Sequence, residues 1–140
     1  MTTPPIQNIA VIGLGTIGHS VAQVYAAAGC TVRCFDPDPT TGASLANRVR
    51  TNLKQMAAAG LSSRDDIEHV VSRFVICDSE AEAVSGAGFV SEAAAEDLTI
   101  KQALFARLEN HIDRHTILAS NTSTYPMTQI SRDMVHPDRA

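Results

Sequence analysis

The sequence contains no long run of basic residues and no apolar run long enough to span a bilayer. Its formal net charge is −4 at pH 7, so nucleic acids and anionic membrane surfaces are not expected partners. The segment from Met1 to Gln7 carries no basic residue before the first apolar stretch, whereas a secretory signal peptide needs one. Together these absences favour a cytoplasmic protein whose partners are neither nucleic acids nor membranes.

Cysteine is scarce and lacks the spacing of a metal or redox site. The three cysteines, Cys30, Cys34 and Cys77, are odd in number, and no C-x-x-C pattern occurs. They favour free thiols in a reducing compartment, and no metal site is predicted. The chain has 140 residues, of which 44% are hydrophobic, and this suits one globular domain over residues 1–140.

What the sequence does contain is a glycine pattern that follows an apolar strand and opens a helix. Gly13, Gly15 and Gly18 have the G-x-G-x-x-G spacing. The first glycine allows a sharp turn, the second lets a pyrophosphate approach the backbone, and the third lets the helix pack against the sheet. The first N–H groups of that helix would face the pyrophosphate. The pattern predicts a dinucleotide-binding loop whose candidate contacts are Gly13, Leu14, Gly15, Thr16, Ile17 and Gly18.

Asp36 follows the second apolar run, eighteen residues after Gly18. A carboxylate at this place can accept hydrogen bonds from both hydroxyls of the adenosine ribose and repel a 2′-phosphate. Asp38 adds negative charge, and no Arg or Lys follows Asp36 closely. We therefore predict that Asp36 selects NAD over NADP. The structural alternative is an Asp that starts an Asp-Pro turn.

Apolar strands alternate with helical segments along the chain. Strands are expected over residues 6–12, 31–35, 74–77, 89–92 and 116–119, with main helices over residues 41–59 and from a cap at residue 97 to residue 112. The first helix should bury Ile17, Val21, Val24, Tyr25 and Ala28, and the helix capped by Asp97 should bury Ile100, Leu104, Phe105, Leu108 and Ile112. This alternation predicts an α/β Rossmann fold, a doubly wound parallel sheet of about five strands in the order 3-2-1-4-5.

Polar residues follow the fourth and fifth strands, at the edge of the sheet where ligands of this fold bind. Glu96 and Lys101 could reach the nicotinamide half of a dinucleotide, or Asp97 and Lys101 could form an ordinary i,i+4 helix pair. The loop of residues 120–124 could orient a carboxamide or a substrate hydroxyl, or it could simply cap a helix. Spacing alone leaves both choices open.

Three segments together resemble the amino-terminal domain of 3-hydroxyacyl-CoA dehydrogenases, namely residues 13–18 with Asp36, residues 92–101 and residues 119–123. The resemblance implies an oxidoreductase of fatty acid metabolism that oxidises a 3-hydroxyl to a ketone and passes hydride to NAD. By motif, Glu96 and Lys101 correspond to NAD contacts. Ser123 corresponds to a serine near both nicotinamide and substrate hydroxyl, which makes it the candidate catalytic residue, and Asn121 lies in the same loop. The resemblance also implies a homodimer in the full-length protein.

Two departures from the resembled family bear on function. Its catalytic histidine, which precedes an aromatic residue and Asn-Pro, has no counterpart in residues 1–140, and neither does its helical substrate and dimerisation domain. The resemblance thus implies an NAD-binding fragment that is inactive alone. The acyl-CoA enzymes also place a serine and a lysine late in the helix of residues 41–59, and the stretch from Asn52 to Ala59 has neither at the matching positions.

These departures leave alternatives to the acyl-CoA reaction. Relatives that oxidise a short polar hydroxy acid, such as gulonate or carnitine, stay open. A non-catalytic NAD-binding module is a rival from another class, and a methyltransferase is a weaker one, since it also uses a glycine-rich first loop.

Overall fold

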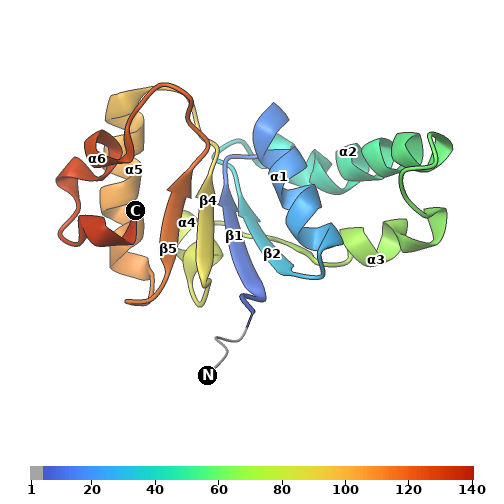
Figure 1. The fold of residues 1–140 in the computed structure, drawn as a ribbon, viewed down its shortest axis with the longest axis horizontal. Coiled ribbons are helices and arrows are strands. Elements are labelled where there is room, and N and C mark those ends of the chain that lie inside the picture. The colour runs from blue at the N-terminus through green and yellow to red at the C-terminus, as the bar shows by residue number, and fades with distance from the viewer. Residues whose placement is uncertain (1–4) are drawn as a thin grey trace.

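The computed structural model describes residues 5–140 as a parallel sheet with helices on both faces (Figure 1). The strands are β1 (Asn8–Ile12), β2 (Thr31–Phe35), β3 (Phe74–Ile76), β4 (Phe89–Glu92) and β5 (Ile117–Ser120). Their order is β3-β2-β1-β4-β5, and every pair is parallel. The predicted Rossmann architecture and strand order are therefore confirmed. Residues 1–4, which belong to the expected domain and to the segment considered for a signal peptide, lie outside the described residues.

The helices form two layers, one on each face of the sheet. α1 (Thr16–Ala27), α2 (Pro39–Ala58) and α3 (Ile67–Val71) pack on one face, and α4 (Glu80–Val84), α5 (Leu98–Leu108) and α6 (Met127–Ile130) pack on the other (Figure 1). Short 3₁₀ turns occupy Arg64–Asp66, Glu109–His111, Ser131–Asp133 and Pro137–Arg139. Because side chains alternate along a strand, β1 supplies Ile9 and Val11 to one core and Ala10 and Ile12 to the other.

Some element boundaries differ from the sequence prediction by a few residues. Asp38 caps α2, so this helix begins at Pro39 and not at residue 41. α5 ends at Leu108 and continues as a 3₁₀ turn, short of the expected residue 112. The other shifts are small: the first strand begins at Asn8, the third ends at Ile76, and the fifth runs over Ile117–Ser120.

The buried face of α1 is a correction to the sequence prediction. The side of α1 toward the sheet is made of Gly18, Ala22 and Ala26, all buried. Ile17 and Val24, which the apolar periodicity placed on that side, are 58% and 65% exposed. Of the other expected residues, Ala28 is also exposed, and Val21 and Tyr25 are half-buried. The helix packs so close to the glycine loop that only small side chains fit beneath it.

The buried face of α5 also differs from its expected composition. Leu104, Phe105 and Leu108 are buried as predicted, but Ile100 is 48% exposed. In its place Lys101 and its neighbour Gln102 are buried, a position that the apolar periodicity could not indicate. Two polar side chains at the start of α5 therefore lie in the interior, and that of Lys101 reaches Glu92 at the carboxyl end of β4.

Within residues 5–140, no helix combines the length and apolar character needed to cross a membrane. The same residues contain no group of three or more His, Cys, Asp or Glu side chains arranged to hold a metal ion.

Candidate functional site

The three positions of the loop after β1 that hold glycine do so for different structural reasons. Gly13 adopts φ +90°, and a Cβ added there would lie 2.6 Å from the carbonyl oxygen of Ala93. A Cβ at Gly18 would lie 1.8 Å from the carbonyl oxygen of Gly13. At Gly15, by contrast, no atom lies within 4 Å of the Cβ position. Gly13 and Gly18 are thus required by the packing of the protein, whereas Gly15 leaves open space that a ligand can enter.

The backbone of this loop is tied to the end of β2. The Gly13 N–H donates to the carbonyl oxygen of Phe35 at 2.9 Å, and the Leu14 N–H donates to Asp36 Oδ2 at 2.8 Å. Leu14 itself is fully buried, so its side chain anchors the loop in the core. The turn is held by these backbone hydrogen bonds and by the buried side chain of Leu14, so its shape does not depend on a ligand.

The first turn of α1 begins at the loop and has a free N-terminus. Thr16 and Ile17 are exposed. Among the described residues, no side chain caps the helix at Gly15, and the first turn contains no acidic residue. The unsatisfied N–H groups and the positive end of the helix dipole are therefore available to an anion.

Asp36 is half-buried where β2 ends, and its carboxylate holds two backbone groups. Oδ2 accepts the Leu14 N–H, and Oδ1 accepts the Asp38 N–H at 2.9 Å. A carboxylate has about four acceptor positions, so hydroxyl donors can still bind it. Asp36 thus forms the turn that its sequence context predicts and also faces the glycine loop. Asp38 turns to Thr40 instead, and the hydrogen bonds from Thr40 lower the pKa of Asp38.

Arg48 brings a positive charge to the glycine loop, which the sequence did not predict. It lies in α2, and its guanidinium donates to the carbonyl oxygen of Thr41 at 2.9 Å, to Ser44 Oγ at 3.1 Å and to the carbonyl oxygen of Gly15 at 3.5 Å. Only the packing of α2 beside α1 brings this cation to the loop. A guanidinium suits the charge of a pyrophosphate.

A pocket of about 470 Å³ connects the glycine loop with the ends of β2 and β4. Gly13, Gly15 and Asp36 line it from one side, and the small side chains of residues 93–95 line it from the other. The remaining lining residues are Ile12, Phe35, Pro37, Glu80, Ile100, Leu104 and Arg107, with Glu80 and Arg107 paired at 2.9 Å. The pocket lies at the carboxyl ends of the strands where the strand order reverses, the place at which this fold binds ligands.

A buried ion pair lies next to this pocket, at the end of β4. Glu92 and Lys101 are both 0% exposed, with Oε1 and Nζ 2.8 Å apart. The same carboxylate accepts the Ala94 N–H at 2.6 Å and the hydroxyl of Ser120. Lys101 Nζ also lies 3.3 Å from Glu96 Oε2. The ammonium group is thus enclosed by two carboxylates, and only Glu96 of these three charged residues reaches the surface.

Asp97 and Lys101 do not form the i,i+4 helix pair, which was one of the two alternatives that spacing left open. Asp97 instead caps α5, its Oδ1 accepting the Ile100 N–H at 2.9 Å. Lys101 points away from Asp97 and into the interior toward Glu92, because a buried carboxylate at the end of β4 needs a cation nearby.

Glu96 connects the start of α5 to the loop after β5. Its Oε1 accepts the hydroxyl of Thr122 at 2.5 Å. This hydrogen bond, followed by the hydrogen bond and charge of Lys101, lowers the pKa of Glu96. Thr122 Oγ1 in turn accepts the N–H groups of Thr124 and Tyr125 at 3.2 Å. The loop is therefore folded around Thr122 and joined to the exposed carboxylate.

Asn121 and Ser123 lie on this loop on either side of Thr122. Asn121 donates its side-chain amide to Ser91 Oγ at 2.9 Å and to the carbonyl oxygen of Glu92 at 3.2 Å. It lines a shallow pocket of about 290 Å³ beside the exposed face of α1, which is a different hollow from the one beneath the glycine loop. Ser123 is exposed. Their roles at a cofactor or substrate stay predictions.

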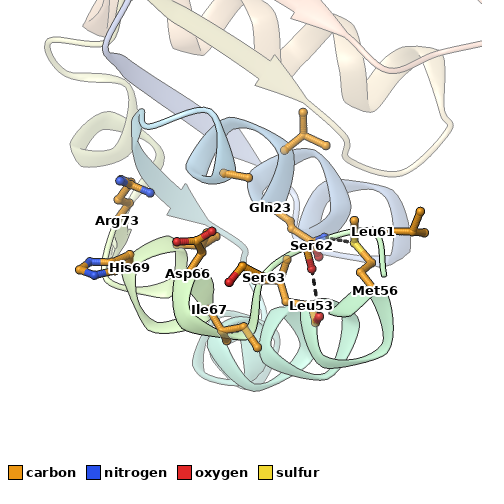
Figure 2. A pocket seen from close by; sticks show the side chains of 13 residues that line it. Gln23, Leu53, Met56, Leu61, Ser62, Ser63, Asp66, Ile67, His69 and Arg73 are labelled. Carbon is orange, nitrogen blue, oxygen red and sulfur yellow. Dashed lines mark hydrogen bonds between the residues drawn. The ribbon is translucent and has the colours of Figure 1, made fainter. Parts of the chain in front are cut away.

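A larger pocket, of about 620 Å³, lies between α1, α2 and α3 (Figure 2). Apolar side chains such as Leu53, Ile67 and Val70 form part of its lining, and Asp66 and His69, which also line it, are exposed. It contains none of the predicted site residues. Volume alone does not make this pocket the functional site, since the loop with the free helix N-terminus lies elsewhere.

The structure thus places Gly13, Gly15 and Asp36 on one pocket and joins Glu96, Lys101 and Asn121 around Glu92. The residues that the sequence did not single out are Glu92 and Arg48, whereas Ser120 and Thr122 belong to the polar segment of residues 120–124 that it did. One feature of the sequence could have indicated Glu92: it is a charged residue at the end of an apolar parallel strand, and a charge buried there needs a partner. Arg48 had no such feature, since its position depends on how two helices pack.

Comparison with known proteins agrees with this geometry. The family model described as 3-hydroxyacyl-CoA dehydrogenase, NAD binding domain, matches residues 8–140. A probable 3-hydroxybutyryl-CoA dehydrogenase of Bacillus subtilis is 35% identical over 134 residues, which are 96% of this chain and 46% of that protein. An L-carnitine dehydrogenase of Streptomyces griseus is 33% identical over 137 residues, which are 96% of this chain and 39% of that protein.

Among solved structures, FadB2 of M. tuberculosis superposes with a TM-score of 0.90 at 28% identity, covering 97% of this chain and 48% of that one. This chain therefore spans less than half the length of each of these three proteins. The matching family domain binds NAD, and the open space at Gly15, the free end of α1 and the carboxylate of Asp36 fit that cofactor. The chain belongs to the 3-hydroxyacyl-CoA dehydrogenase family, and its residues 8–140 correspond to the NAD-binding domain of that family.

Proposed function

We propose that residues 1–140 form the NAD-binding domain of a dehydrogenase that oxidises a 3-hydroxyacyl-CoA to its 3-ketoacyl form. The observation that carries the proposal is the pocket shared by Gly13, Gly15 and Asp36 on one side and the alanines after β4 on the other. The probable 3-hydroxybutyryl-CoA dehydrogenase among the relatives supports the acyl-CoA substrate class.

In this proposal the residues of the domain divide the work of holding NAD. Gly13, Leu14, Gly15, Thr16, Ile17 and Gly18 supply the backbone that receives the pyrophosphate, and Asp36 receives the adenosine ribose. Glu96, Lys101, Asn121 and Ser123 form the nicotinamide side, with Ser123 orienting the substrate hydroxyl as the candidate catalytic residue. When bound, NAD supplies the hydride acceptor, and the base that takes the hydroxyl proton is not among these residues.

A short polar hydroxy acid, of the gulonate or carnitine type, is the second candidate substrate. Asn52 stands in the part of α2 where the resembled acyl-CoA enzymes carry a serine, and it donates to Gln23 Oε1 at 3.1 Å and lies 3.1 Å from His19 Nε2. This stretch is occupied with contacts to α1, and a relative is named L-carnitine dehydrogenase. A cytoplasmic location, a small-molecule substrate without nucleic acid or membrane, and a homodimer of the full-length protein belong to the same proposal. A non-catalytic NAD-binding module is the rival without turnover.

Calorimetric titration of the 140-residue chain with NAD and NADP tests the proposal. We expect NAD to bind more tightly, because Asp36 would face the 2′-phosphate of NADP. Losing a hydrogen bond to a charged group costs about 1.5–3 kcal/mol, so Asp36→Ala should weaken NAD binding by about tenfold or more. The neighbouring Asp38→Ala, which removes only the cap of α2, should lower thermal stability and leave NAD affinity within about twofold. Equal affinity of the unmodified chain for NAD and NADP would contradict the role of Asp36.

The same preparation should bind NAD without catalysing oxidation. Formation of NADH is followed with 3-hydroxybutyryl-CoA and with carnitine as substrates. The His–aromatic–Asn-Pro motif is absent from the sequence, and loss of a general base costs about 10²–10⁴ in rate. Substantial turnover by the 140-residue chain would mean that the base lies within it, and His136 would then be the first residue to substitute.

A further inference from the structure

The buried carboxylate of Glu92 is the least explained charged group of the molecule. Its side chain is 0% exposed, so no cofactor or substrate can touch it without a change of the structure. Yet it lies beneath the residues of the proposed nicotinamide side. A buried ion pair with Lys101 contributes little to stability by itself, since desolvation offsets much of the attraction.

Three chain segments meet at this one side chain. Glu92 ends β4 and accepts the N–H of Ala94 in the following loop, the ammonium group of Lys101 in α5 and the hydroxyl of Ser120 at the end of β5. Its carbonyl oxygen also accepts the N–H of Asn121 at 2.8 Å. The backbone and the side chain of Glu92 together hold the end of β5 and the loop after it, which carries the candidate residues Asn121 and Ser123.

The contacts continue from Glu92 to the surface. The ammonium group of Lys101 pairs with both the buried Glu92 and the exposed Glu96. Glu96 in turn accepts the hydroxyl of Thr122 in the loop after β5. These bonds form a closed circuit, because Ser120 ends β5 and Thr122 lies in the loop that follows it, while Glu92 and Lys101 belong to β4 and α5. The exposed carboxylate of Glu96 is the only charged group of this circuit that a ligand can reach directly.

We propose that Glu92 is a positioning residue for the nicotinamide half of NAD: its buried carboxylate fixes Lys101, and through Lys101 and Ser120 it fixes Glu96 and the loop of residues 120–123. The inference rests on the proposed function, which assigns the adenosine half to Asp36 and the nicotinamide half to the side of β4 and β5. It assigns Lys101 an indirect part, since its ammonium group is enclosed. A role confined to folding would affect both halves of the cofactor alike.

The test compares two ligands on the same variants. NAD probes the whole site, and ADP probes only the adenosine and phosphate part. Glu92→Gln keeps the size of the side chain and removes its charge. We expect its NAD affinity to fall by about tenfold or more, while its ADP affinity stays within about twofold of the unmodified chain. Glu68→Gln is the matched control, because it breaks the Arg50–Glu68 ion pair between α2 and α3, away from the pocket, and neither affinity should change.

A second variant guards against loss of folding. Ser120→Ala removes the hydrogen bond between the Glu92 carboxylate and the end of β5, and it leaves the ion pair with Lys101 intact. If Glu92→Gln fails to fold, a selective loss of NAD affinity in Ser120→Ala supports the proposal. Equal losses for NAD and ADP, or no loss for either ligand in a folded variant, overturn it. An unmodified chain that binds neither ligand overturns the proposed function first, and this inference with it.

Discussion

At the scale of single residues, adding the same methyl group to Gly15 and to Gly18 should affect the stability of the protein differently. Gly15 has an extended backbone and open space at its Cβ position. Gly15→Ala should therefore change the free energy of unfolding by no more than about 0.5 kcal/mol. The methyl group would occupy the space that a pyrophosphate needs, so NAD affinity should fall by about tenfold or more. Thermal unfolding and calorimetric titration measure the two effects separately.

Gly18→Ala supplies the contrast to that variant. Its Cβ would lie 1.8 Å from the Gly13 carbonyl oxygen, and α1 must move away from the loop to avoid the clash. We expect a loss of about 1–3 kcal/mol in stability, as for other overpacked positions, together with loss of NAD binding. Similar stability losses in both variants would contradict the distinction between packing and ligand space.

At the scale of elements, the buried side of α1 is formed by its small residues and not by its large apolar ones. Its largest apolar side chains are mostly outside the buried stripe, whereas Ala22 and Ala26 are 0% exposed. Val24→Ser should thus change stability by no more than about 0.5 kcal/mol. Ala22→Leu should cost about 1–3 kcal/mol, because no space exists for the longer side chain. Urea unfolding measures the stability of the two variants. A larger loss of stability for Val24→Ser than for Ala22→Leu would mean that α1 buries the side expected from the apolar periodicity.

The same contrast explains how much could be predicted from the sequence. The strand order and the glycine loop were predictable, since both depend on short segments and on the regular alternation of strands and helices. The buried side of α1 was not, because the close packing of the helix selects small side chains over large apolar ones. The Glu92–Lys101 pair was not predicted either, since it joins a strand to a helix nine residues later. Spacing offered Asp97 as one possible partner of Lys101, and in the folded protein the partner is the buried Glu92.

At the scale of the whole molecule, the sheet has an open edge at β5. Among residues 5–140, β5 pairs with β4 only, and the segment after residue 126 packs beside α5 and does not cover the strand (Figure 1). Ile117 on this strand is 49% exposed. An uncovered strand edge favours pairing with another chain. We expect the 140-residue chain to self-associate as its concentration rises, which sedimentation velocity can follow.

A charged residue on that edge should prevent the association. Ile117→Lys places an ammonium group beside the open backbone groups of β5 and should shift the equilibrium toward the monomer. Val75→Lys on β3 is the control, because β3 has only three residues and short edge strands pair poorly. A chain that stays monomeric at high concentration before any substitution would rule out β5 as an assembly edge.

The strand order also has a consequence in time. Ile9 of the central strand β1 pairs with Phe89, 80 residues later in the chain. At a synthesis rate of about 5–20 residues per second, roughly 4–16 s separate the two segments as they leave the ribosome. During that interval β1 and β2 can pair, but the other side of β1 has no neighbour. The glycine loop is therefore made well before the residues after β4 that form the opposite wall of its pocket.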